Sequence, residues 1–255
     1  MLKPALNIAR FTLLEGWRTH ALWGIVGVII VALVAAEFAA GLAITESESY
    51  RVLIYASLVR ALLVLIFMLL VATSVVRELH DRQLDFTLSR PVSRASWMVG
   101  RLLGFWILSA AAVGIAGLPL LWHGASSGAA AWLITFQLEL AIVCAATMTC
   151  VVTLRQVTLA VTVAAGFYVL SRAIDMLVLM SRGPTVDPNA WVSQVVAEGI
   201  DGLALVLPAL GRVAQSEWLS SGTVATPISG TVIECLVYSA LLLAIGLFDF
   251  YRVDD

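Results

Sequence analysis

The sequence is poor in the residues that nucleotide, metal and nucleophile sites most often require. It contains a single lysine, Lys3, among 255 residues. A phosphate-binding loop of the G-x-x-x-x-G-K-S/T type needs a lysine that reaches the phosphates, and no such pattern surrounds Lys3. The chain therefore cannot energise a process with a nucleotide site of that class.

Histidine and cysteine are equally scarce. The three histidines lie far apart in the sequence and form no H-E-x-x-H pattern, and the three cysteines lack the spacing of metal ligands. There is also no G-x-S-x-G nucleophile motif. We therefore expect no metal, no cofactor and no enzymatic activity in this chain, and we expect the cysteines to act as small apolar groups. These residues are His20, His80, His123, Cys144, Cys150 and Cys235.

Charge is the third scarcity. Charged residues make up 13% of the chain and hydrophobic residues 61%, and the mean hydropathy is +0.98. Soluble domains are about half apolar, so this composition indicates an integral membrane protein. The formal net charge of −2 gives no basic field of the kind that attracts nucleic acid.

Six long apolar runs set the fold class. Each holds about 20 or more mostly apolar residues, enough for a helix to cross roughly 30 Å of hydrocarbon. The runs are continuously apolar, whereas the strands of a membrane barrel alternate apolar and polar residues over about ten positions. We predict an all-α, polytopic six-transmembrane-helix bundle that forms one membrane domain over residues 1–255. The expected spans are about 21–44, 52–76, 99–122, 129–154, 157–180 and 231–250.

Two segments flank these spans. Residues 4–20 begin with a proline at a helix-start position and are predicted to form an interfacial helix with Leu6, Ala9, Leu13 and Trp17 on one face, and Asn7, Glu15 and Arg18 on the other. The alternative is a plain cytoplasmic extension of the first span. The apolar run of that span is too long for the core of a cleavable signal, so we expect the span to be retained. Residues 181–230 hold an apolar stretch, 199–211, that is too short to span, so it should lie at the outer interface or re-enter partway.

Basic residues gather beside one set of span ends. Ten of the fifteen lie there, only three lie on the opposite side, and two fall inside spans. Positive charge beside spans tends to stay cytoplasmic, so both termini are predicted to be cytoplasmic. The ten are Lys3, Arg10, Arg18, Arg77, Arg82, Arg90, Arg94, Arg101, Arg155 and Arg252; the opposite three are Arg51, Arg182 and Arg212.

The connection from Arg77 to Arg94 is unusually polar for this chain. It holds seven charged residues and a histidine in eighteen positions. In its first part, opposite charges recur at three and four positions, which places them on one face of a helix. Pro91 then ends that helix, because proline lacks an amide hydrogen and disfavours helix at Arg90. On charge alone, a solvated cytoplasmic loop is the plainer interpretation.

The order of residues in this connection resembles the ABC-2 type permeases, the membrane subunits of a group of ATP-binding-cassette transporters, and in particular the six-span branch that includes permeases for multicopper-enzyme and nitrous oxide reductase maturation. That branch carries a glutamate after the second span, then a Gly-Thr-Leu-Glu-like run, S-R-P-x-S-R, and Gly-Lys. Arg82 and Gln83 stand where Gly-Thr is usual, and Arg101 replaces the lysine. The matching residues are Glu78, Leu84, Asp85, Ser89, Arg90, Pro91, Ser93, Arg94, Gly100 and Arg101. The segment 207–222 and the tail FDFYRVDD resemble the end of such permeases.

This resemblance implies a function and a set of partners. It implies a multi-pass permease of the bacterial inner membrane, exporter-like, that forms a translocation pathway as a dimer, with two identical chains as the expected form. Two copies of a separate cytoplasmic ATPase would bind ATP and magnesium, and an extracytoplasmic accessory protein is a further expected partner. Residues 77–98 would be the coupling region, with a coupling helix in a cleft of the ATPase. The coupling contacts expected are Glu78, Asp81, Arg82, Asp85, Arg90, Pro91 and Arg94.

Charges inside the expected spans form a second candidate site. An ionised group at the bilayer centre costs on the order of 3 kcal/mol or more unless it is paired or hydrated. We expect an outer polar network or wet vestibule, with Arg172 paired to Asp175, and Arg60 near Glu139 or Glu37; a role limited to holding helices together is the alternative. The network residues are Glu37, Arg60, Glu139, Arg172, Asp175 and Glu234.

Two other functions fit parts of the pattern. A secondary transporter would use interrupted helices and mid-membrane charges in two related halves, and no such pairing of halves is visible. A membrane-anchoring or structural subunit without ATPase coupling would need none of these features. Both leave the charged connection unexplained.

Overall fold

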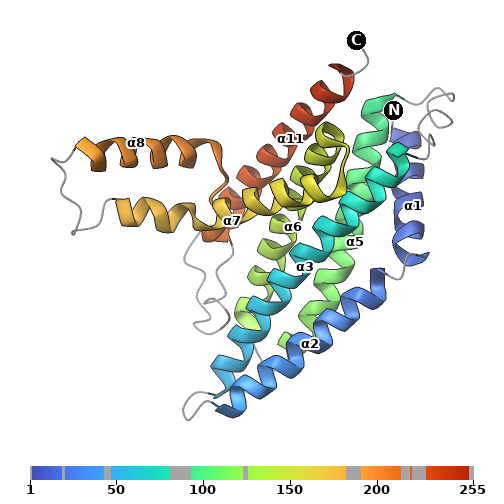
Figure 1. Ribbon diagram of the computed structural model, residues 1–255. Helices are drawn as coiled ribbons and strands as arrows, with labels where there is room; N and C mark the ends of the chain where they lie inside the picture. Colours follow the sequence, from blue (N-terminus) through green and yellow to red (C-terminus); the bar gives the residue numbers. More distant parts are fainter. Residues whose placement is uncertain are drawn as a thin grey trace.

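The computed structural model describes residues 2–18, 21–42, 47–80, 93–122, 126–181, 191–213, 219 and 228–252. Over these ranges the regular structure is helical throughout, and six helices are long and apolar enough to cross a membrane. This confirms the predicted all-α, six-span bundle (Figure 1). The six are α2 (Ala21–Leu42), α3 (Ser47–His80), α5 (Arg94–Trp122), α6 (Ser126–Leu154), α7 (Val157–Ser181) and α11 (Ile228–Arg252).

Helices α3 and α6 form the centre of the bundle. Their most apolar stretches are 61% and 78% buried, whereas those of α2, α7 and α11 are 28%, 22% and 17% buried. The core that they share with α5 includes the fully buried side chains of Phe67, Phe105 and Phe136. Because α3 and α6 are apolar all round, they can be enclosed by other helices, while the outer helices keep an apolar face for lipid.

Helix α3 is longer than a membrane span requires. Its 34 residues correspond to about 51 Å at 1.5 Å per residue, compared with roughly 30 Å of hydrocarbon. The sequence predicts a span that ends at residue 76, but the helix continues without a break for another turn to His80. The last turn of α3 therefore carries Arg77 and Glu78 as a rigid extension of the bundle.

The first helix, α1 (Leu2–Arg18), packs against α5 through small residues. A Cβ atom on Gly104 would lie 2.5 Å from the Cβ of Thr12 and 3.0 Å from the carbonyl oxygen of Ala9. The predicted helix is confirmed. Of its predicted apolar face, Ala9 is buried and Leu6 is 57% exposed, and Thr12 and Gly16 are buried beside Ala9. Close backbone approach at Gly104 selects small partners, so Gly104 serves the packing of α1 on α5 within one chain.

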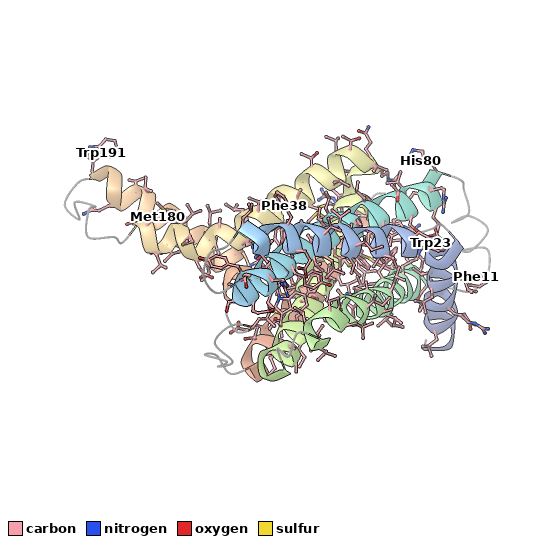
Figure 2. The ribbon with its side chains drawn as sticks, turned by 90° about the horizontal axis from the view of Figure 1, so that it is seen from below. Phe11, Trp23, Phe38, His80, Met180 and Trp191 are labelled. Carbon is pink, nitrogen blue, oxygen red and sulfur yellow. The ribbon has the colours of Figure 1, made fainter. Side chains whose placement is uncertain are left out.

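Helices α7 and α8 (Trp191–Val206) form an arm that projects from the bundle (Figure 1). Figure 2 shows Met180 and Trp191 at its far end. The 16 residues of α8 are too few to cross a bilayer, in agreement with the prediction of a non-spanning segment in this region. The short helix α9 (Leu210–Val213) returns to the bundle, where a Cβ on Gly211 would lie 2.9 Å from the carbonyl oxygen of Arg172.

Both chain termini lie at one end of the bundle, together with the end of α3 and the start of α5 (Figure 1). We call this the terminal end. The predicted orientation makes it cytoplasmic. The middle of the charged connection, residues 81–92, lies outside the described residues, and with it the predicted coupling helix and the turn at Pro91.

Candidate functional site

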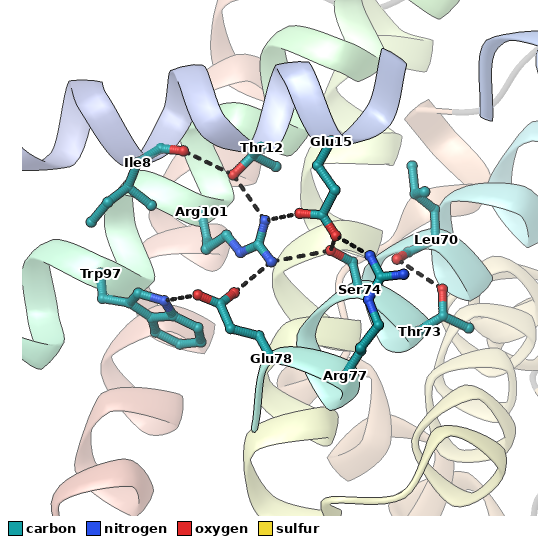
Figure 3. Close-up of polar contacts among 10 residues, drawn as sticks. All are labelled: Ile8, Thr12, Glu15, Leu70, Thr73, Ser74, Arg77, Glu78, Trp97 and Arg101. Atoms are coloured by element: carbon teal, nitrogen blue, oxygen red, sulfur yellow. Dashed lines mark hydrogen bonds and ion pairs between the residues drawn. The ribbon is translucent and has the colours of Figure 1, made fainter. Parts of the chain in front are cut away.

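Polar side chains from α1, α3 and α5 meet at the terminal end (Figure 3). Each helix contributes residues about one turn apart, so their side chains leave the same face of the helix. The three faces converge where α3 ends and α5 begins (Figure 3). We define the terminal cluster as Thr12, Glu15, Ser74, Arg77, Glu78, Trp97 and Arg101.

Arg101 is the hub of the terminal cluster. Its side chain is 6% exposed and lies between two carboxylates: Nη1 is 2.6 Å from Glu15 Oε2, and Nη2 is 2.5 Å from Glu78 Oε2. Nη1 also donates to Thr12 Oγ1 at 3.2 Å, and Nη2 donates to Ser74 Oγ at 3.2 Å. One guanidinium thus joins three helices, a task suited to its planar fork of donors.

Glu15 ties α1 to the end of α3. Its Oε1 accepts hydrogen bonds from Ser74 Oγ and from Arg77 Nη2, both at 2.8 Å. Burial raises the pKa of this carboxyl, but the nearby Arg101 charge and hydrogen bonds from Arg101, Ser74 and Arg77 outweigh it and hold the pKa below the ordinary value of 4.5. Glu15 is therefore ionised at neutral pH. The sequence predicts it on the polar face of an interfacial helix, and in the structure this face contacts α3 and α5.

Glu78 faces the bundle. Its side chain is 16% exposed, its Oε1 accepts from Trp97 Nε1 at 2.9 Å, and its Oε2 meets Arg101. The charges of Arg77 and Arg101 balance those of Glu15 and Glu78, so the four sum to zero. Such balance lowers the cost of partly removing these charges from water.

A second set of contacts holds the other end of the charged connection. Ser93 caps α5, since its Oγ accepts from the backbone amide of Ser96 at 3.3 Å. Arg94 Nη1 donates to the carbonyl oxygen of Phe250 at 3.0 Å, and its guanidinium lies 5.2 Å and 5.7 Å from the ring centres of Phe250 and Tyr251. The closing aromatic segment of the chain therefore packs on the residue that ends the connection.

The predicted coupling residues divide into two groups. Glu78 and Arg94 are described, and they hold the two ends of the connection to the bundle. The others lie outside the described residues: Asp81, Arg82, Asp85, Arg90 and Pro91.

Within the bundle, α3, α6 and α7 bring a second polar group together. We define the buried cluster as Arg60, Thr135, Glu139, Tyr168 and Arg172. Arg60 and Glu139 are fully buried, with Arg60 Nε 3.3 Å from Glu139 Oε2. Glu139 Oε1 accepts from Tyr168 Oη at 2.8 Å and from Arg172 Nη1 at 3.0 Å. A single carboxylate therefore faces two guanidinium groups.

Aromatic rings and a hydroxyl complete the surroundings of Arg60. Its guanidinium lies 5.2 Å from the ring centre of Trp132 and 5.3 Å from that of Phe136, distances at which the ring faces attract a cation. Arg60 Nη2 also donates to Thr135 Oγ1 at 3.4 Å. These contacts help to offset the cost of burying a charge in this position.

The sequence predicts part of this cluster. Its first alternative for Arg60, a position near Glu139, is confirmed. Glu37 pairs with another arginine: one of its carboxylate oxygens lies 3.2 Å from Arg51 Nε. Glu37 is near the end of α2 and Arg51 is near the start of α3. Arg172 contacts Glu139; its predicted pairing with Asp175 stays a prediction. Glu234 lies on the exposed side of α11.

Several residues escape prediction. Arg101 matches the position of a family lysine, yet nothing in the sequence marks it as the hub; Glu15 and Tyr168 carry no motif at all. A usable signal is spacing: Ser74 with Glu78, and Trp97 with Arg101, are polar or aromatic pairs at four positions. Such pairs beside a span end indicate a helix face that meets polar partners.

The two clusters offer ion pairing and hydrogen bonding. No group of three or more histidine, cysteine, aspartate or glutamate side chains gathers into a metal site among the residues that the structure describes. Comparison of the chain with protein-family models and with curated proteins finds no match.

Proposed function

We propose that the chain is the membrane-spanning subunit of an ABC-2 type transporter, driven by a separate cytoplasmic ATPase through the connection between α3 and α5. In this proposal the chain forms the translocation pathway together with a second copy of itself. ATP and magnesium bind to the partner ATPase. The proposal rests on the motif resemblance of residues 78–101 and on the geometry at the terminal end.

The observation that carries the proposal is that both ends of the charged connection are held firmly. At one end, Glu78 meets Arg101 and Trp97. At the other, Ser93 caps α5 and Arg94 is bound to the end of α11. A solvated loop needs no such anchoring, whereas a segment that passes the rigid-body movement of a partner into the membrane requires it.

The proposal gives the coupling residues two roles. Asp81, Arg82, Asp85 and Arg90 are the proposed contacts with the ATPase, and Pro91 sets the turn between them and α5. Glu78 and Arg94 are positioning residues, because their side chains are engaged with the bundle. A force on the connection would then reach α1, α3 and α5 together through Arg101.

The test is purification of the tagged chain from its native membrane, followed by identification of any co-purifying ATPase. We expect an ABC-type ATPase near a one-to-one ratio with the chain. A combined Arg90→Ala and Pro91→Ala variant should reduce its recovery at least fivefold. The matched control is Arg10→Gln, which removes an exposed cation from α1 at the same end. If no ATPase accompanies the chain, or if both variants retain it equally, the proposal is wrong.

The buried cluster favours a second candidate function, secondary transport. The Glu139 carboxylate lies between two guanidinium groups, of which Arg60 is fully buried and Arg172 is 37% exposed, and transporters commonly use such groups for ion coupling. Proteoliposomes that contain the chain alone would test this function. Anion or proton flux without any ATPase, lost in Glu139→Gln, would support secondary transport and count against ATPase coupling.

A further inference from the structure

A cavity of about 550 Å³ opens between α1, α2, α3 and α5 next to the terminal cluster. Its volume falls within the range of about 300–1,000 Å³ that is usual for small-molecule sites. Gly24 and Leu69, which line it, are exposed, so the cavity is open on the outer side of the bundle. Figure 1 shows α1 and α2 meeting at an angle beside α3 and α5, and the cavity lies in this corner.

The lining of the cavity changes from apolar to polar along the axis of α3. Its polar wall faces the terminal cluster and includes Glu15, Ser74 and Arg77, and its apolar wall runs along α3 and α5 toward the membrane interior. On α3, the lining positions 66, 69, 70, 73, 74 and 77 recur at three and four residues, which is one helix face. They change from apolar to polar toward the terminal end: Ile66, Leu69, Leu70, Thr73, Ser74 and Arg77.

We propose that this cavity binds a membrane phospholipid, with an acyl chain along Ile66, Leu70 and Phe105 and the phosphate at Arg77. The apolar wall follows the membrane-spanning part of α3, and the polar wall follows its last turns at the terminal end, which matches the order of acyl chain and headgroup in a phospholipid. The proposal does not depend on the ATPase partner, because the cavity lies between α1, α2, α3 and α5.

Arg77 supplies hydrogen-bond donors for a phosphate at the polar wall. The Glu15 carboxylate is already occupied on both oxygens, by Ser74 and Arg77 on Oε1 and by Arg101 on Oε2. Arg77 uses Nη2 in this contact, and its side chain is 58% exposed. A guanidinium has five N–H donors, so Arg77 retains donors for a phosphate oxygen while it stays bound to Glu15. A phosphate there would add a ligand to the terminal cluster without displacing any contact.

Two glycines of α2 allow a sharp test of occupancy. Gly24 lines the cavity, while Gly27, one turn further along, does not; at either position an added Cβ would meet nothing within 4 Å. Gly24→Leu should therefore fill the cavity without disturbing the fold, and Gly27→Leu is its matched control. By native mass spectrometry with added dioleoyl phosphatidylglycerol, we expect the control to keep one lipid per chain and Gly24→Leu to lose at least 90% of that adduct. Equal adducts in the two variants would overturn the proposal.

Separate binding measurements test whether the phosphate is recognised. Dioleoylglycerol, which lacks the phosphate, and glycerol 3-phosphate, which lacks the chains, should each bind at least tenfold more weakly than the phospholipid. Arg77→Gln should weaken phospholipid binding several-fold, and Arg10→Gln, which changes an exposed arginine outside the cavity, should not. Equal binding of dioleoylglycerol, or no difference between the two arginine variants, would show that the phosphate is not recognised and would refute the proposal.

Discussion

The two polar clusters solve the problem of charge in a membrane protein in opposite ways. The terminal cluster balances two cations against two anions at the end of the bundle, and two of its members, Glu15 and Arg77, remain partly exposed. The buried cluster sets one carboxylate, Glu139, against Arg60 and Arg172, with the first ion pair fully enclosed. The ion pairs of the terminal cluster lie near water, where they can break and re-form at small cost. The Arg60–Glu139 pair is enclosed, and the cost of leaving either charge buried alone holds it in place.

The comparison separates their roles. The terminal cluster joins α1, α3 and α5 at the end of the charged connection and beside the cavity. It is therefore suited to transmit a movement of the connection to these three helices. The buried cluster fixes α3, α6 and α7 relative to one another, and loss of the Glu139 charge leaves Arg60 without its counter-ion in an apolar interior.

The largest expected effect is at Glu139. Glu139→Gln should lower the free energy of unfolding by about 3–5 kcal/mol, because it leaves Arg60 buried without its counter-ion. Reversible unfolding in mixed micelles measures this loss. The double variant Arg60→Met with Glu139→Leu should recover most of the stability. If the single variant is as stable as the native chain, the buried cluster is not the more constrained of the two.

Arg101 tests the terminal cluster in the same assay. Arg101→Met should cost about 2–3 kcal/mol, less than Glu139→Gln, because the carboxylates that it strands can be partly hydrated. Arg101→Lys should fall in between, since an ammonium cannot reproduce the planar fork. A loss for Arg101→Met that exceeds the loss at Glu139 would reverse the ranking of the two clusters.

Gly104 reports on how tightly α1 is held over the terminal cluster. Gly104→Ala should destabilise by about 1–3 kcal/mol through overpacking, because its Cβ would lie 2.5 Å from Thr12. Gly114→Ala on the same helix is the control, since an added Cβ there meets nothing within 4 Å, and it should be neutral or slightly stabilising. Thermal unfolding of both variants in detergent gives the difference. Similar melting temperatures would mean that α1 does not dock as described.

The smallest effect expected is a pH dependence confined to the terminal cluster. The pKa of Glu15 is lowered in the folded chain, so its contribution is complete above the ordinary value of 4.5 and is lost as the pH falls through the folded-state pKa. Hydrogen exchange of the α1 amides between pH 6 and pH 3 should show this loosening, and Glu15→Gln should loosen α1 at all of these pH values. Protection of α1 that is independent of pH in the native chain would contradict the assignment.

The predictions from sequence succeed for features that depend on one helical segment alone. The six spans follow from unbroken apolar runs, and α1 follows from a proline start and a helical period. The Arg60–Glu139 pair was within reach because few charges lie in the spans and each needs a partner. The partners of Glu15 are not predicted, because Ser74, Arg77 and Arg101 lie on other helices far away in the chain.

The sequence by itself determined which segments are helices and that they belong in a membrane, because hydropathy and helix length are properties of each segment alone. Only the tertiary structure decided which polar side chains meet. That choice depends on the rotation and tilt of each helix against its neighbours, and small-residue contacts such as Gly104 on Thr12 and Gly211 on α7 set these angles. Arg101 became a hub, and a cavity formed beside it, because three helices were brought to one point by packing.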